Sequence, residues 1–411
     1  MKPDESAAAT QPRAIRIVNC NDRVRSCKRG VCMNEMSQAD FAALAPGISW
    51  YYNWHFDTKN QGGSGDMRFI PMLWGKSPEA LHGLDQYLAS TTPMPPVVLA
   101  INEPNLKGQA FITPRETADL YRHCKEITDR YHIPLAGPNM ALGSATDDSI
   151  TAHDPLENKT TTYTFMVPFI KATLHFLQES NTEVPALAFH SYRDAGEIKW
   201  AAEMMHETFN CPIWVTEYAQ WSAADAEAAR KYMMEATDFL ERTPYVAGYA
   251  WFKDRMQDNP NISLLEPESG RLSPLGETYV SLPAHDDSVY YRIPGRLQAQ
   301  DYVTMNGAEI RPTADTNGKY QMDSCIGGAT LDYNIQVDAP GAYTLAFRVS
   351  GSGGKFDVIK VGGIIASAET PGGKDWHTVR TAVRLVAGPQ KLQVQYSASG
   401  LCLNWIEFAR L

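Results

Sequence analysis

The chain has 411 residues, of which 44% are hydrophobic and 20% are charged, so it can bury a large core and we expect two domains. Its formal net charge is −10 and it has no block of Lys and Arg, which argues against nucleic acid and against an anionic membrane surface as partners. No apolar run approaches the ~20 residues that a membrane-spanning helix needs.

Residues 1–27 are expected to form a leader or N-terminal extension, because MKPDESAAATQPR has no hydrophobic stretch of its own and is not a signal peptide as written. The seven cysteines are an odd number, so at least one has no partner within the chain. Cys20, Cys27 and Cys32 are close enough in sequence for one local disulfide. No CxxC pair is present, so a structural zinc site is not expected.

Between residues 28 and 283, short apolar runs rich in β-formers alternate with longer helical patterns. Several runs are apolar nearly throughout, as parallel strands covered on both faces should be. The helical patterns begin with start signals, such as Ser37, or Thr113 followed by Pro114. The alternation favours an α/β fold of the (β/α)8 TIM-barrel type, and no Gly-rich phosphate loop follows the first run. The eight apolar runs are 29–35, 47–54, 68–75, 97–105, 133–142, 186–192, 211–219 and 246–254.

After this region the pattern changes. Residues 284–289 are polar and are expected to be a linker. Residues 290–411 contain short alternating segments separated by Gly, Pro, Asn and Asp, without helical periodicity. Such a pattern predicts a β-sandwich.

Two glutamates, Glu103 and Glu217, end the fourth and the seventh apolar run. The C-terminal tips of barrel strands form the active-site face, so both carboxylates should reach one cleft. Cleavage of a glycosidic bond needs two carboxyl groups there, one as proton donor and one as nucleophile or base. Asn102 is expected to hydrogen-bond the substrate 2-hydroxyl, and Pro104 turns the chain away so that Glu103 projects.

Either glutamate alone is a weak signal, because a glutamate that ends a strand more often starts a helix or pairs with a surface cation. Glu35, at the end of the first run, illustrates this alternative. It leads directly into the helix that begins at Ser37, and no proline follows it. We interpret Glu35 as structural or as a minor pocket residue.

Aromatic side chains at other strand ends are suited to a sugar, because indole and phenol rings stack on the apolar faces of pyranose rings. We expect Trp54, Trp74 and Trp251 to be stacking platforms and Tyr52 to contact the substrate. For each of these rings, packing in the core is the alternative interpretation.

His190 and Tyr192 end the sixth run and are expected to hydrogen-bond Glu217 or the sugar beside it. A zinc-binding role for His190 is not favoured, because no second His or Cys lies at ligand spacing. We therefore expect no metal at this site.

Five ordered segments, GISWYYNW, FIPMLWG, INEPN, FHSY and WVTEYA, together resemble those of glycoside hydrolase family 128, the Asl1-like β-1,3-glucanases. The resemblance implies hydrolysis of β-1,3-glucan with retention of configuration, with Glu103 as acid/base and Glu217 as nucleophile. Retention requires the two carboxyl groups to lie ~5–5.5 Å apart, since no water has to fit between the nucleophile and the sugar.

In the C-terminal region, IPGRLQAQDY, DAPGAYTLAFRVSG, AGPQKLQVQY and LNWIEF resemble a family 6 carbohydrate-binding module, a β-jelly roll. The resemblance implies that the module holds the enzyme on insoluble glucan. Tyr320, Trp376 and Asn404 are its candidate sugar-binding residues.

Two differences from the module family limit this inference. Where the family has Glu-Ala-Glu, this chain has Gln298-Ala299-Gln300, and the loss of two charged ligands argues against the family's structural calcium. The family's sugar-binding asparagine falls at Cys402. The alternative is a module that only packs against the barrel.

The residue patterns predict a glycoside hydrolase that needs no cofactor for its chemistry, and the family resemblance implies that it is a retaining β-1,3-glucanase. The alternatives are a retaining hydrolase of the same clan that acts on another β-glucan or a β-xylan, and a non-catalytic polysaccharide-binding protein. We expect β-glucan as the partner, with no nucleic acid and no membrane, and a secreted or cell-envelope monomer.

Overall fold

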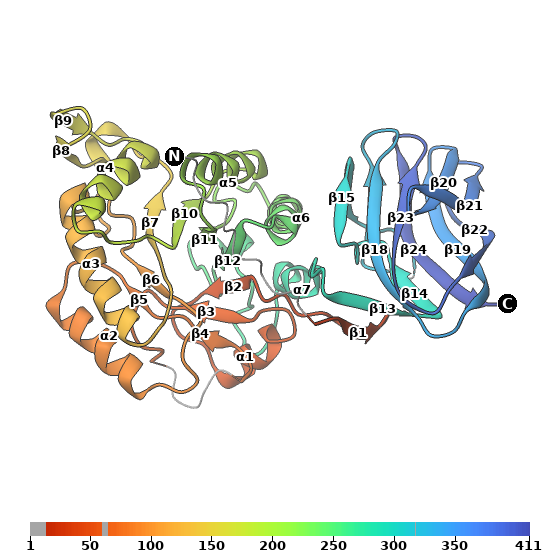
Figure 1. Ribbon diagram of the computed structural model, residues 1–411, viewed down its shortest axis with the longest axis horizontal. Coiled ribbons are helices and arrows are strands. Elements are labelled where there is room, and N and C mark those ends of the chain that lie inside the picture. The colour runs from red at the N-terminus through yellow and green to blue at the C-terminus, as the bar shows by residue number, and fades with distance from the viewer. Residues whose placement is uncertain (1–13, 60–64, 317) are drawn as a thin grey trace, which may run out of the picture. The chain divides into compact units, whose positions relative to one another are not determined.

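The computed structural model describes residues 14–59, 65–316 and 318–411, and residues 1–13 of the leader predicted over 1–27 lie outside them. The chain divides into two compact units. The first spans residues 25–282, and the second combines residues 283–411 with the described residues before Arg25. The first is an α/β unit and the second is β-rich, which confirms the predicted order of the two classes of domain (Figure 1).

Parallel strands form a nine-stranded sheet in the first unit, in the order β4-β3-β2-β12-β11-β10-β7-β6-β5. All eight predicted runs supply its strands, and the third run is divided into β4 and β5 by Ile70 and Pro71. The two ends of the sheet path are therefore neighbours in the chain. The strands are β2 (Arg29–Cys32), β3 (Trp50–Tyr52), β4 (Arg68–Phe69), β5 (Met72–Leu73), β6 (Val98–Ala100), β7 (Leu135–Ala141), β10 (Ala186–Ser191), β11 (Ile213–Tyr218) and β12 (Val246–Phe252).

These runs form strands because their side chains are covered on both faces. Every residue of β7 and of β10 is buried, as the nearly continuous apolar sequence predicts for a parallel sheet. One buried cluster joins β5, β6 and β7 to the helices that follow, and Leu84, Tyr121 and Leu177 are among its members. The sheet therefore has a fixed register, and the ends of its strands can hold polar side chains in set positions.

In the part of the first unit that the structure describes, seven α-helices surround this sheet (Figure 1). Ser37 and Thr113 cap the first and third of them with reciprocal capping boxes, which confirms both sequence-based start signals. The helices are α1 (Gln38–Leu44), α2 (Pro78–Ser90), α3 (Pro114–Arg130), α4 (Met166–Glu179), α5 (Ala195–Phe209), α6 (Ala226–Arg242) and α7 (Pro274–Ser281). The segment between β7 and α4 adds the hairpin of β8 (Thr151–Asp154) and β9 (Lys159–Thr162).

Two further sheets make up the second unit. One has the order β1-β13-β18-β23-β20-β21 with β15 beside β18, and the other has the order β16-β17-β24-β19-β22 with β14 beside β24. The strands are β1 (Arg16–Asn19), β13 (Val289–Ile293), β14 (Gly295–Gln298), β15 (Thr304–Asn306), β16 (Ala308–Pro312), β17 (Tyr320–Ser324), β18 (Thr330–Val337), β19 (Gly341–Gly351), β20 (Gly354–Lys360), β21 (Gly363–Thr370), β22 (Gly373–Leu385), β23 (Gly388–Tyr396) and β24 (Leu401–Arg410).

The N-terminal region differs from the prediction of a simple leader. β1 lies within residues 1–27 but pairs in parallel with β13, so it is part of the second unit. All seven cysteines carry free thiols. The local disulfide that the spacing of Cys20, Cys27 and Cys32 allowed is therefore not formed, and Cys32 instead lies buried beside Tyr52. In the described part of the chain, no helix is long and apolar enough to cross a bilayer.

Candidate active site

A cleft of about 750 Å³ lies where the strands of the first unit end. Most of the residues predicted to form the site line it, together with segments that follow β7 and β10. The predicted residues in its lining are Trp54, Trp74, Asn102, Glu103, His190, Tyr192 and Glu217. Glu35 is exposed and does not line the cleft. The structure thus brings together two carboxylates that are far apart in sequence.

The chain reverses sharply around Glu103. Ile101 and Glu103 have positive φ angles of 61° and 43°, a conformation that non-glycine residues rarely adopt and a β-branched residue almost never. The Glu103 N–H donates to the Asn139 carbonyl at 2.7 Å. This strained turn fixes the Glu103 side chain, which is 7% exposed, in the cleft wall.

Glu217 ends β11 and is held by three donors. Its Oε1 accepts hydrogen bonds from Trp54 Nε1 at 2.7 Å and from the Tyr52 hydroxyl at 3.1 Å, and its Oε2 accepts from the Tyr192 hydroxyl. Burial and the Glu217 carboxylate raise the pKa of Tyr192 well above its ordinary value, so this phenol remains a proton donor. Three donors on one buried carboxylate fix its orientation.

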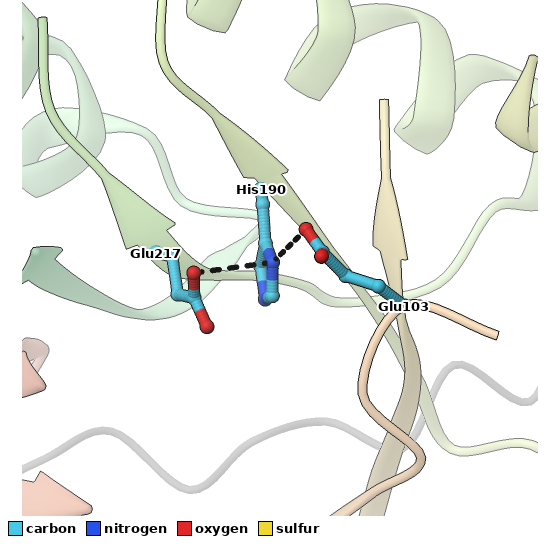
Figure 2. A group of neighbouring side chains, drawn as sticks. All are labelled: Glu103, His190 and Glu217. Carbon is cyan, nitrogen blue, oxygen red and sulfur yellow. Dashed lines mark hydrogen bonds and ion pairs between the residues drawn. The ribbon is translucent and has the colours of Figure 1, made fainter. Parts of the chain in front are cut away.

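His190 lies between the two glutamates, as Figure 2 shows. Its Nδ1 is 2.8 Å from Glu103 Oε1 and 3.4 Å from Glu217 Oε2. Burial opposes the charged form of this imidazole, but the carboxylates of Glu217 and Glu103 outweigh it and raise the pKa of His190 above the ordinary histidine value. The imidazole ring of His190 therefore interacts electrostatically with both glutamates.

A chain of hydrogen bonds fixes the other nitrogen of His190. Asn139 donates from Nδ2 to the Ala100 carbonyl at 2.8 Å, so its Oδ1 accepts the Thr216 hydroxyl at 2.9 Å. The Thr216 oxygen, 3.0 Å from His190 Nε2, can then only accept from that nitrogen. His190 therefore carries a proton on Nε2, and Nδ1 is the atom that exchanges protons with the carboxyl groups.

Asn102 has one donor in use and one acceptor open. Its Nδ2 donates to Gln109 Oε1 at 3.0 Å. Its Oδ1 is buried and has no hydrogen-bond partner among the described residues. An unsatisfied acceptor in a cleft wall is costly, and a substrate hydroxyl could satisfy it.

Trp251 is fully buried, so the prediction that it is a stacking platform is wrong. Its ring packs in the core against Tyr218, and its Nε1 donates to the Ile262 carbonyl at 2.8 Å. Because side chains alternate along β12, the next residue, Phe252, lines the cleft in its place. Tyr52 is also fully buried and reaches Glu217 without lining the cleft.

Two further aromatic residues of the cleft wall were missed by the sequence-based interpretation. Phe165 directly precedes α4 and Trp200 lies within α5, away from the strand ends, and both line the cleft. Trp200 is 51% exposed. No motif marks either residue, and their rings are brought together only by tertiary packing.

The atoms of Glu103, His190 and Glu217 could also hold a metal ion. Among the described residues they are the one group of three His, Cys, Asp or Glu side chains whose ligand atoms lie within 4.8 Å of one another. A catalytic zinc ion commonly has three protein ligands. However, both oxygens of Glu217 already accept hydrogen bonds, so its charge is stabilised without an ion. The expected absence of a metal stays a prediction.

The candidate sugar-binding residues of the second unit do not form an open clamp. Tyr320 is 2% exposed and Asn404 is fully buried, where its Nδ2 donates to Asp315 Oδ2 at 2.8 Å. The burial of Tyr320 and Asn404 argues against the prediction that these two residues bind sugar. Trp376, on β22, is partly exposed.

The implied calcium site does not fit the residues present. The Oε1 atoms of Gln298 and Gln300 are buried without a hydrogen-bond partner among the described residues. They are neutral amide oxygens, whereas a hard divalent cation prefers a set that includes carboxylates. No role for calcium follows from this arrangement.

Two family models and several solved structures match this chain. A family model described as the glycosyl hydrolase catalytic core matches residues 30–279, and one described as the carbohydrate binding module (family 6) matches residues 298–410. A solved GH128 (subgroup II) endo-β-1,3-glucanase from Pseudomonas viridiflava is 31% identical, with a TM-score of 0.55 over 64% of this chain and 100% of that chain. A second one, from Sorangium cellulosum, is 26% identical, with a TM-score of 0.52 over 63% and 100%. No curated protein sequence matches.

Proposed function

Since this chain belongs to glycoside hydrolase family 128, we propose that it hydrolyses β-1,3-glucan and that Glu103 and Glu217 carry out the reaction. The two solved structures at 31% and 26% identity are endo-β-1,3-glucanases, which supports this linkage. The cleft, with two buried carboxylates and aromatic walls, has the chemistry that a glycosidic bond requires.

In the proposed first step, the Glu217 carboxylate attacks the anomeric carbon of the bound sugar. Glu103 gives its proton to the glycosidic oxygen, so that the leaving part of the chain departs as an alcohol and a glycosyl ester forms on Glu217. In the second step, Glu103 is a carboxylate and takes a proton from the attacking water. The ester bond breaks, and Glu217 is regenerated.

Proximity of the two carboxylates is the observation that carries this proposal. One oxygen of Glu103 and one of Glu217 lie within 4.8 Å of each other. Inverting enzymes separate their carboxyl groups by ~6.5–9.5 Å to admit a water molecule, whereas retaining enzymes place them ~5–5.5 Å apart. The short separation supports retention.

A time course of hydrolysis by NMR tests the reaction and its stereochemistry. The substrates are β-1,3-glucan, β-1,4-glucan and β-xylan, with Glu35→Gln as a control because Glu35 lies outside the cleft. We expect fastest turnover of β-1,3-glucan, first-formed product of β configuration, and normal activity in the control. First-formed α product would reject the nucleophile role of Glu217. Faster turnover of another polymer would favour a related glycanase, and binding without any turnover would favour a non-catalytic protein.

For the architecture, we propose that the nine-stranded path is a closed (β/α)8 barrel and that the second unit is a jelly roll. β4 pairs with β3 and β5 pairs with β6, so the two short strands act as halves of one barrel strand. A crystal structure of the full chain tests both descriptions.

We also propose that the second unit holds the enzyme on insoluble glucan, and that the protein is a secreted or cell-envelope monomer without a required cofactor. The family 6 match over residues 298–410 supports the first statement. Pull-down of the full chain with insoluble β-1,3-glucan, compared with Trp376→Ala, tests it. Gel filtration tests the monomeric state, and cell fractionation tests the location. An activity assay after chelation tests the absence of a required metal cofactor.

A further inference from the structure

We infer that Trp200 and Phe165 form a sugar-stacking subsite of the catalytic cleft, which binds a glucosyl ring of a β-glucan chain beyond those at the scissile bond. This inference rests on the proposed function and deepens it, because it links the activity to the length of the substrate. Neither residue belongs to the strand ends that carry the catalytic groups.

The two rings form one exposed aromatic surface. Their centroids are 6.0 Å apart with an angle of 27° between the planes. Trp200 is 51% exposed although it lies within α5, whose other face buries Ile198 and Ala202. A tryptophan on the solvent side of a helix adds little to the core, so its role is better sought in binding.

Phe165 lines the cleft from a position in the chain where a residue that caps the helix would be expected. Phe165 occupies the N-cap position of α4 and makes no side-chain cap hydrogen bond, although Ser, Thr, Asp and Asn are preferred there. Its backbone pairs with Gly143, which also lines the cleft. The ring is therefore held by the backbone beside the cleft.

Polar groups accompany the rings. Glu197 lies one turn before Trp200 on α5, so the two side chains share one face of the helix. Glu197 accepts a hydrogen bond from the Ser191 hydroxyl at 3.0 Å and is 3.3 Å from Arg193 Nη1. Glu197, Ser191 and Arg193 also line the cleft. An aromatic face with neighbouring carboxylate, hydroxyl and guanidinium groups is suited to a pyranose ring, whose faces are apolar and whose rim is polar.

The occupant is a β-glucan chain because the rings and the catalytic pair share one cleft of about 750 Å³. That volume is in the ~300–1,000 Å³ range typical of pockets for drug-sized ligands. A short oligosaccharide can occupy the catalytic centre without reaching Trp200. A longer chain gains a stacking contact.

Trp200→Ala, measured on laminari-oligosaccharides of increasing length, tests this inference. We expect kcat/KM to fall about tenfold on the longest oligosaccharides and on laminarin, as loss of one aromatic contact of ~1–1.5 kcal/mol predicts. On the shortest oligosaccharide that is cleaved, kcat/KM should stay within about twofold. Trp200→Phe should restore most of the loss, because it keeps an aromatic face.

Leu156→Ala is the matched control, because Leu156 is 54% exposed between β8 and β9 and does not line the cleft. It should leave the length dependence unchanged. An equal fall on short and long substrates in Trp200→Ala, or no fall on either, would overturn the inference. A change in melting temperature or in oligomeric state without a change in length dependence would also overturn it, in favour of a packing role. If the unmodified enzyme does not cleave β-1,3-glucan at all, the proposed function fails instead.

Discussion

Glu103 follows β6 and Glu217 lies near the end of β11, and the two side chains are similarly buried, with Glu103 7% and Glu217 5% exposed. Their surroundings differ. Glu217 accepts hydrogen bonds from Tyr52, Trp54 and Tyr192. Among the described residues, Glu103 has one close side-chain partner, His190, at 2.8 Å. The pairing of β11 with β12 shifts register between Val215 and Tyr218, whereas Ile101 and Glu103 have positive φ angles.

This contrast suggests how one residue type can take two roles. Donors that converge on a carboxylate stabilise its anion and hold it still, which suits a nucleophile. A carboxyl group whose single partner is a histidine, and which otherwise faces the cleft, is better placed to gain and lose a proton. Three substitutions and one titration test whether Glu103 and Glu217 have these separate roles.

The largest effect is expected for Glu217→Gln. Loss of a covalent nucleophile should lower kcat by on the order of 10⁵-fold. The loss should be the same for substrates with good and poor leaving groups, because the bond to Glu217 forms with both. Steady-state kinetics on laminarin and on an aryl β-glucoside measure this, and a strong dependence on the leaving group would contradict the assignment.

Glu103→Gln should be less severe. Loss of a general acid typically costs about 10²–10⁴-fold. On an aryl substrate whose leaving group needs no proton, the rate of the first step should be nearly unchanged, while the second step still lacks its base. A burst of phenol followed by slow turnover is therefore expected. Stopped-flow release of the phenol measures it. If Glu103→Gln and Glu217→Gln gave the same leaving-group dependence, the two carboxylates would not have separate roles.

Tyr192→Phe removes one of the three donors to Glu217 and keeps the ring. A hydrogen bond to a charged group contributes ~1.5–3 kcal/mol, so kcat/KM should fall about 10–100-fold. Tyr131→Phe is the control, because its hydroxyl bonds to Asp85 outside the cleft. An unchanged kcat/KM in Tyr192→Phe would show that this donor does not support the nucleophile.

The smallest change concerns the charge on His190. Because the pKa of His190 is raised, the folded protein keeps a proton that the unfolded chain releases above pH ~6.5. The charged ring therefore contributes fully to the free energy of unfolding below pH ~6.5, and this contribution is lost as the pH rises through the raised pKa. NMR titration of the ring should show Glu103→Gln and Glu217→Gln each lowering the pKa, because each removes a carboxylate. The larger fall is expected for Glu217→Gln, because the Glu217 carboxylate is the largest of the influences that raise the pKa of His190. The opposite order would show that Glu103 is the stronger partner of the charged ring.

Much of the catalytic unit could be predicted from local patterns. The eight apolar runs all became strands, because nearly continuous hydrophobicity over a short length suits a strand buried on both faces. Ser37 and Thr113 cap helices as predicted, since a cap depends only on residues within one turn. Glu103 and Glu217 reached one cleft because the ends of parallel strands share one edge.

The errors arose where the direction of a side chain depended on its neighbours. Trp251 and Phe252 are adjacent, and the sequence does not tell which of them faces the cleft. In the second unit, Tyr320 and Asn404 looked like sugar-binding residues but are buried. β1 was not expected as a strand, because it is short and its partner, β13, is distant in the chain.

Local sequence patterns were sufficient to predict the strands, the caps and the two glutamates with the asparagine and proline around Glu103, because these depend on periodicity and on contacts between close neighbours. Tertiary packing was needed to place His190 between the carboxylates with its Nε2 proton held by Thr216, to bring the Trp54 donor to Glu217, and to bring Trp200 against Phe165. Each of these contacts joins residues on different elements. Their distances follow from how the sheet and helices pack, which no local pattern encodes.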